Sequence, residues 1–146
     1  MLLRTHLVAA LAAGLYFQSP SWQLLLALII SATVPDIDTP KSFLGKRLPI
    51  ISYPLKFFVG HRTLFHAVWL PAALFFFLAD FHSISLGILI GYGSHLLLDS
   101  LTRQGVQPFY PLKFRLRGPV ETGGFFEGIF FILLVTADAF LVVKMF

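Results

Sequence analysis

Five apolar stretches dominate the sequence and restrict its fold more than any other feature. They cover residues 2–17, 22–34, 64–78, 83–101 and 125–146. Charged residues make up only 12% of the chain, about half the share in a typical soluble protein. A membrane-spanning helix needs about 20 apolar residues. The first three stretches are shorter, so they could span the membrane only with the help of flanking residues or where the bilayer is thinned. The sequence predicts an all-α, polytopic membrane helix bundle with about five transmembrane or re-entrant helices.

Two long connections, residues 35–63 and 102–124, carry most of the charged residues. The prolines of the first connection argue against one continuous helix there. Residues 50–59 are expected to lie along the membrane interface or to re-enter the bilayer. Because no sequence repeat or linker divides the chain, residues 1–146 are predicted to form a single domain.

Prolines and glycines add detail to the predicted helices. Pro35 should end the second helix, because the residue before a proline avoids helical geometry. Pro71 should kink the third helix. Gly87 and Gly91 form a GxxxG pair, extended by Gly93, which favours close packing of the fourth helix against a neighbour.

The distribution of positive charge predicts the orientation in the membrane. Ten of the 11 Lys and Arg residues fall near the N-terminus or in the two long connections, and only Lys144 falls on the other side. The positive-inside rule therefore puts the N-terminus and both connections in the cytoplasm. This topology accounts for the net charge of +4, so no nucleic-acid partner is expected. An alternative interpretation treats the first apolar stretch as a cleaved signal peptide.

Seven histidines and aspartates are predicted to lie at one depth, near the cytoplasmic helix ends. They are His6, Asp36, Asp38, His61, His66, His95 and Asp99. Ionisable residues within the membrane are rare and usually functional. Imidazole and carboxylate ligands suit zinc, with manganese, iron or nickel as alternatives, and the absence of cysteine excludes thiolate sites. The pattern predicts one or two divalent metal ions, with Zn²⁺ preferred.

The spacing of these residues is suited to shared metal binding. His95 and Asp99 are four residues apart, so a helix places both side chains on one face. Asp36 and Asp38 can direct two carboxylates at one ion or at two. Either could instead act as the catalytic base, and the residues alone leave that choice open. His82 falls on the opposite side of the membrane and is expected to be exposed or interfacial.

Three further residues are candidates for catalysis or substrate binding. Arg62 lies between two candidate ligands and could bind a substrate anion, since the geometry of a guanidinium matches that of phosphate oxygens. Alternatively, Arg62 only adds to the positive charge of the cytoplasmic side. Thr102 could hydrogen-bond a metal ligand and is also a candidate substrate contact. Glu127, at the start of the fifth helix, could orient a histidine or act as a general acid. Asp138, near the middle of that helix, has no evident partner.

Four short motifs occur together in this chain. They are residues 5–6 (TH), 35–38 (PDID), 61–66 (HRTLFH) and 93–102 (GSHLLLDSLT). Together they resemble the bacterial and archaeal family of small inner-membrane metal-dependent hydrolases of the YdjM type. The resemblance implies a divalent-metal-dependent hydrolase in the inner membrane of a prokaryote.

The ligand order is also similar, more distantly, to part of the zinc-dependent phospholipase C and P1-type nuclease site. This likeness implies one metal surrounded by Asp36 or Asp38, His61 or His66, His95 and Asp99. It further implies that Asp99 bridges to a second metal held by His6. The later histidine ligands of that trinuclear site are missing from this chain, so at most two metals are expected.

The predicted function is a membrane-bound hydrolase that cleaves a phosphate ester or phosphodiester with a metal-activated hydroxide. A site at the membrane surface favours a lipid headgroup, and the basic connections favour an anionic phospholipid. The sequence leaves two alternatives open, a divalent-cation transporter or channel and a non-catalytic metal-binding membrane scaffold. It does not predict an oligomeric state.

Overall fold

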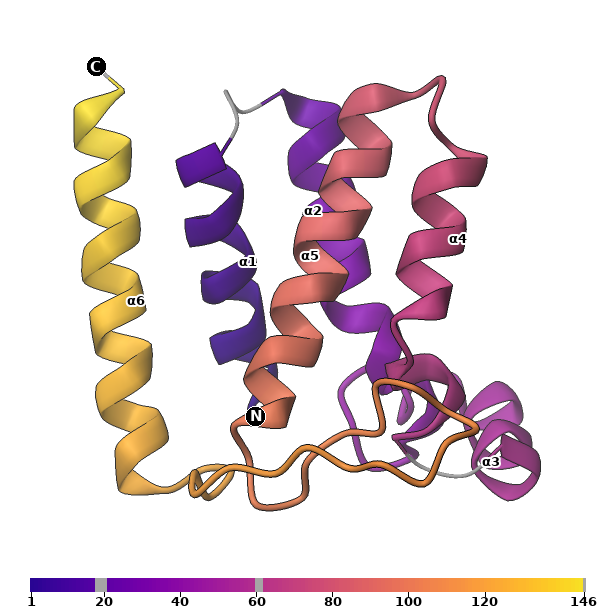
Figure 1. Cartoon of the computed structure of the whole chain (residues 1–146). Coiled ribbons are helices and arrows are strands. Elements are labelled where there is room, and N and C mark those ends of the chain that lie inside the picture. Colours follow the sequence, from indigo (N-terminus) through magenta and orange to yellow (C-terminus); the bar gives the residue numbers. More distant parts are fainter. Residues whose placement is uncertain (18–20, 60–61, 146) are drawn as a thin grey trace.

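The computed structural model describes residues 1–17, 21–59 and 62–145, and the fold they form is all-α (Figure 1). The α-helices are α1 (Leu3–Phe17), α2 (Trp22–Thr33), α3 (Pro49–Val59), α4 (Trp69–Phe77), α5 (His82–Ser100) and α6 (Phe125–Lys144). Two short 3-10 helices, η1 (Val34–Asp38) and η2 (Leu64–His66), join the longer elements. Figure 1 shows α3, both long connections and the N-terminus at one end of the upright helices, and the C-terminus at the other.

Small residues bring α2 and α5 into close contact. A Cβ atom added to Gly91 would lie 2.2 Å from Ser31 Oγ and 2.7 Å from the Leu28 carbonyl oxygen. A Cβ atom added to Gly87 would lie 2.7 Å from the Cβ atom of Ala27. The Ser31 hydroxyl also donates a hydrogen bond to the Gly87 carbonyl oxygen at 3.1 Å. The predicted close packing through the GxxxG pair is therefore confirmed.

Proline has different effects in the second and third apolar stretches. The α-helix of the second stretch ends at Thr33, just before Pro35, as predicted. The expected physical reason does not hold, since Val34 keeps right-handed helical geometry and the chain continues through Pro35 as η1. The third stretch is not one kinked helix, because η2 and α4 divide it. Pro71 is the third residue of α4, where a backbone N–H would have no partner within the helix in any case. The predicted kink at Pro71 is therefore wrong, since the helix starts just before it.

Helix α3 occupies part of the first long connection and leaves its apolar side chains uncovered. Ile50, Phe57 and Phe58 are each more than 80% exposed, whereas Ser52 is buried. Such an apolar, exposed helix beside basic residues is typical of an interfacial segment. Its location at a membrane interface stays a prediction.

The structure supports the membrane assignment only in part. Within the described residues, α6 is the one helix long and apolar enough to cross a membrane. Helices α1, α2 and α4 have 15, 12 and 9 residues, which is short for a span of about 20. The five-span bundle is therefore not established, although α2, α4 and α6 carry exposed large apolar side chains.

We expect Gly91→Ala to lower the free energy of unfolding by about 1–3 kcal/mol, because the new methyl group meets the Leu28 backbone. Gly93→Ala is the matched control on the same helix, since a Cβ atom there has no neighbour within 4 Å. Denaturant unfolding of both variants in one detergent measures the difference. Equal stability of the two variants would contradict the close α2–α5 contact.

Candidate metal centre

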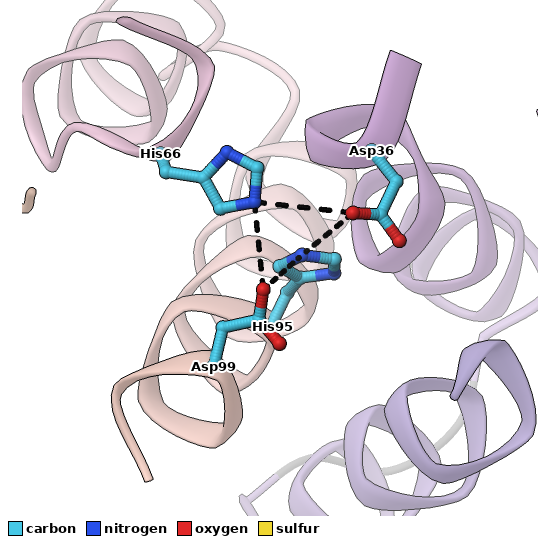
Figure 2. A group of neighbouring side chains, drawn as sticks. All are labelled: Asp36, His66, His95 and Asp99. Carbon is cyan, nitrogen blue, oxygen red and sulfur yellow. Dashed lines mark ion pairs between the residues drawn. The ribbon is translucent and has the colours of Figure 1, made fainter. Parts of the chain in front are cut away.

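Four side chains from three separate segments meet at the end of the molecule where the long connections lie. Asp36 comes from η1, His66 from η2, and His95 and Asp99 from α5 (Figure 2). Each offers one ligand atom, and these four atoms all lie within 4.8 Å of one another. The side chains of the two histidines and Asp99 are fully buried, whereas that of Asp36 is 18% exposed. We refer to these four residues as the metal group.

The separations within the metal group are close to those of a tetrahedral metal site. His66 Nε2 lies 3.9 Å from Asp36 Oδ1 and 3.6 Å from Asp99 Oδ2. His95 Nε2 lies 3.8 Å from each of the same two oxygens. Ligand atoms about 2.1 Å from a tetrahedral zinc ion are roughly 3.4 Å apart. A small inward movement of the side chains would therefore let all four bind one ion.

Both histidines are oriented by partners on their other ring nitrogen. The Nδ1–H of His95 donates to the carbonyl oxygen of Ala32 at 2.8 Å, which directs the Nε2 lone pair into the metal group. Within the described part of the chain, this buried Nε2 has no hydrogen-bond partner. His66 Nδ1 lies 3.7 Å from Asp38 Oδ2. A metal-binding histidine usually has such a carbonyl or carboxylate behind it.

Asp36 and Asp38 therefore occupy different positions. Asp36 places Oδ1 in the metal group, whereas Asp38 lies behind His66. The buried Asp38 carboxylate accepts hydrogen bonds from the Arg62 backbone N–H and the Thr39 hydroxyl, each at 3.0 Å. The 3-10 geometry of η1 permits this division, because residues two apart on a tight turn point in different directions.

Arg62 and Thr102 hold Asp99 in place through its side chain and its backbone. Arg62 Nη2 lies 2.6 Å from Asp99 Oδ2, and Nη1 donates to Thr102 Oγ1 and to the Gly105 carbonyl oxygen, each at 3.2 Å. The Thr102 hydroxyl donates to the Asp99 carbonyl oxygen at 2.7 Å. Arg62 adopts φ +58°, a left-handed conformation that is uncommon for a residue other than glycine. In this structure its guanidinium holds a carboxylate of the metal group.

His6 lies next to the metal group without belonging to it. Its ring stacks on that of His95, with centroids 3.9 Å apart, and its Nε2 lies 3.3 Å from Asp99 Oδ1. The Met1 amine pairs with the same oxygen. Asp99 thus faces the metal group with Oδ2 and the start of α1 with Oδ1. Binding of a second metal by His6 stays a prediction.

Two other predicted site residues have different outcomes. Glu127 is buried, and its carboxylate accepts hydrogen bonds from the Leu2 N–H, the Thr5 hydroxyl and the Gly123 N–H at 2.6–2.7 Å. The contacts with Leu2 and Thr5 tie the start of α1 to α6, and the structure does not place Glu127 in the metal group. His61 lies outside the described residues.

Sequence reasoning missed two groups that position the histidines. One is the Ala32 carbonyl, which no side-chain pattern could reveal. The other is Tyr92, whose hydroxyl donates to the Phe65 carbonyl oxygen at 2.5 Å and so ties η2 to α5. Tyr92 precedes His95 by three residues, so helical spacing could have placed both on one face.

The charges of the site favour a bound cation. Asp36, Asp38 and Asp99 contribute three carboxylates, and the cations that contact Asp99 are Arg62 and the Met1 amine. With neutral histidines the site keeps an excess of negative charge. Burial and the nearby Asp99 carboxylate raise the pKa of Asp36 above its ordinary value, and a metal ion would favour its ionised form.

We expect the purified protein to hold about one equivalent of a transition metal and His95→Ala to lose most of it, because one of four ligands is removed. His82→Ala is the control, since it removes a histidine at the far end of α5. Elemental analysis after supply of zinc or manganese measures the difference. A folded wild-type protein without metal would contradict this assignment.

We expect Asp38→Asn to weaken metal affinity by about 10- to 100-fold at unchanged stoichiometry, because Asp38 orients His66 without entering the metal group. Competition with a chromophoric chelator measures the affinity. Asp80→Asn, in the turn before α5, should leave it unchanged. Complete loss of stoichiometric metal in Asp38→Asn would instead make Asp38 a ligand.

Comparison with known proteins assigns the chain to a family. Residues 1–145 match the family described as YdjM inner membrane protein. The inner membrane protein YdjM of Escherichia coli is 37% identical over 114 residues, covering 70% of this chain and 57% of the relative, and that of Shigella flexneri matches equally. This chain therefore aligns with little more than half the length of those relatives. YvsG of Bacillus subtilis is 30% identical over 146 residues, covering 94% of this chain and 91% of the relative.

No solved structure matches the chain. The family match covers nearly all of the sequence, and it includes each segment that contributes to the metal group. The chain belongs to the YdjM inner membrane protein family.

Proposed function

We propose that this protein is a membrane-bound, metal-dependent hydrolase that cleaves a phosphate ester or phosphodiester of a lipid headgroup. The observation that carries the proposal is the buried metal group, in which two oriented histidines and two carboxylates converge. A divalent metal in these ligands would supply Lewis acidity, which makes water more acidic and withdraws charge from a phosphoryl oxygen. The inner-membrane names of the family and of its E. coli member support a lipid substrate.

A cavity borders the metal group at Asp36 and supports a route for substrate and water. It has a volume of about 430 Å³ and is lined in part by Asp36 and Arg62. Asp36 is the most exposed member of the metal group, and it connects the group to the cavity. Substrate bound in this cavity would approach the buried histidines from the Asp36 side.

The residues of the site divide into holding and proton-accepting roles. His66, His95, Asp99 and Oδ1 of Asp36 would hold the ion, and Arg62 keeps the Asp99 carboxylate in place. Asp36 directs Oδ1 at the imidazoles, and Figure 2 shows its second oxygen pointing away from them. We assign to that second oxygen the proton that water loses as it attacks phosphorus. The phosphorus–oxygen bond to the alcohol breaks in the same reaction, and the departing alcohol takes up a proton from solvent. Arg62 also lines the cavity, where its positive charge favours the phosphoryl group.

We expect the metal-loaded protein to hydrolyse a phosphoester and His95→Ala to lose at least about 100-fold of the turnover, equivalent to about 2.7 kcal/mol. The substrates are p-nitrophenyl phosphate, bis(p-nitrophenyl) phosphate, and phosphatidylglycerol and phosphatidic acid in mixed micelles. Release of nitrophenol from the two chromogenic esters, of phosphate from phosphatidic acid, and of glycerol or glycerol phosphate from phosphatidylglycerol measures turnover.

His82→Ala is the control, and it should keep wild-type turnover and metal. Turnover that persists in metal-free His95→Ala would contradict the proposal. Metal binding without hydrolysis of any of these substrates would favour the non-catalytic scaffold instead.

A further inference from the structure

The cavity next to the metal group is lined by far more positive than negative charge. Its basic side chains are Lys41, Lys46, Arg47 and Arg62, and Asp36 is its acidic one. Arg62 is already paired with Asp99. Across the described ranges, Lys41 and Lys46 form no ion pair, so their charges are free to bind a ligand. An anion in this cavity would therefore meet two cations, Lys41 and Lys46, that have no role in the proposed reaction.

Hydrogen bonds fix the basic loop relative to the metal group. The Ser42 hydroxyl donates to the Asp36 carbonyl oxygen at 2.8 Å and accepts from the Gly45 N–H at 2.9 Å. A Cβ atom at Gly45 would lie only 2.0 Å from the Thr39 carbonyl oxygen, so the turn requires a glycine. The segment that supplies Asp36 to the metal group therefore also positions Lys41 and Lys46.

Arg47 is held in place by the same loop. Its Nη1 donates to the Phe43 carbonyl oxygen at 3.1 Å, and its guanidinium lies 3.6 Å from the centre of the Phe43 ring. A guanidinium held in this way loses little further conformational freedom when it binds a phosphate. Leu2, Leu3 and Phe43 give the cavity an apolar wall beside these cations.

We propose that Lys41, Lys46 and Arg47 form a binding subsite for a phosphate-bearing ligand, separate from the metal group but in the same cavity. This inference rests on the proposed function, since it names the subsite that would select the substrate of that reaction. Cations combined with an apolar wall fit a phosphorylated compound with an adjoining hydrocarbon portion. A lipid headgroup and a water-soluble phosphate ester share this chemistry.

The test compares two charge-matched double variants, Lys41→Gln/Lys46→Gln and Lys113→Gln/Arg117→Gln. The second pair lies in the other long connection and does not line the cavity. The probes are dihexanoyl phosphatidic acid below its micellar concentration and glycerol 3-phosphate, titrated into metal-loaded protein in a non-ionic detergent. Calorimetry measures ligand binding, and elemental analysis measures metal content.

We expect the cavity variant to raise the Kd of the ligand by about 10- to 30-fold, because two cations near the anion are lost, while its metal content is unchanged. The control variant should change the Kd by less than about threefold. Equal losses in both variants, or no loss in the cavity variant, would overturn the subsite. Tighter binding of phosphatidic acid than of glycerol 3-phosphate identifies a lipid headgroup as the source of the bound phosphate. Equal binding of the two identifies a water-soluble phosphate ester as that source.

Failure of the subsite and failure of the proposed function give different results. If the wild-type protein binds neither metal nor ligand, the proposed function and the subsite both fail. If it binds metal and hydrolyses a phosphoester but the cavity variant binds as tightly as wild type, only the subsite is wrong.

Discussion

The buried carboxylate of Asp99 is the interaction on which the remainder of the structure depends. Its side chain is fully buried, and a buried charge is costly unless it is paired. One oxygen faces His6 and the Met1 amine at the start of α1, and the other faces Arg62, His66 and His95. These contacts join α1, the first long connection and α5. Loss of this carboxylate would therefore disturb the fold and the metal group together.

Helix packing and the metal group are coupled in a second way. The close approach of α2 and α5 at Gly87 and Gly91 continues toward the site, where the Ala32 carbonyl accepts the hydrogen bond of His95. One turn beyond, α2 tightens into η1 and brings Asp36 opposite the same imidazole. The position of His95 therefore depends on the small residues of α5 that precede it, since they set the distance between the two helices.

The four residues of the metal group all belong to the larger set that the sequence singled out, because spacing and predicted depth require no long-range contact. The i, i+4 pair of His95 and Asp99 is one example. Tertiary contacts were needed to separate the similar residues Asp36 and Asp38, since only the position of His66 shows which carboxylate lies behind it. The role of Glu127 depended in the same way on distant contacts, because Leu2 and Thr5 both donate to its Oε1 while Gly123 donates to its Oε2.

The sequence by itself determined an all-helical chain, a fourth apolar helix that packs closely against a neighbour, and a set of histidines and aspartates suited to a metal. These properties follow from the apolar stretches, from the size of glycine, and from ligand chemistry, all of which are local. Only the tertiary structure decided which four residues meet, that Arg62 holds Asp99, and that a basic cavity opens beside Asp36. Those arrangements bring together segments far apart in the sequence, as in the hydrogen bond between Ala32 and His95, which are 63 residues apart, and no local pattern specifies such pairs.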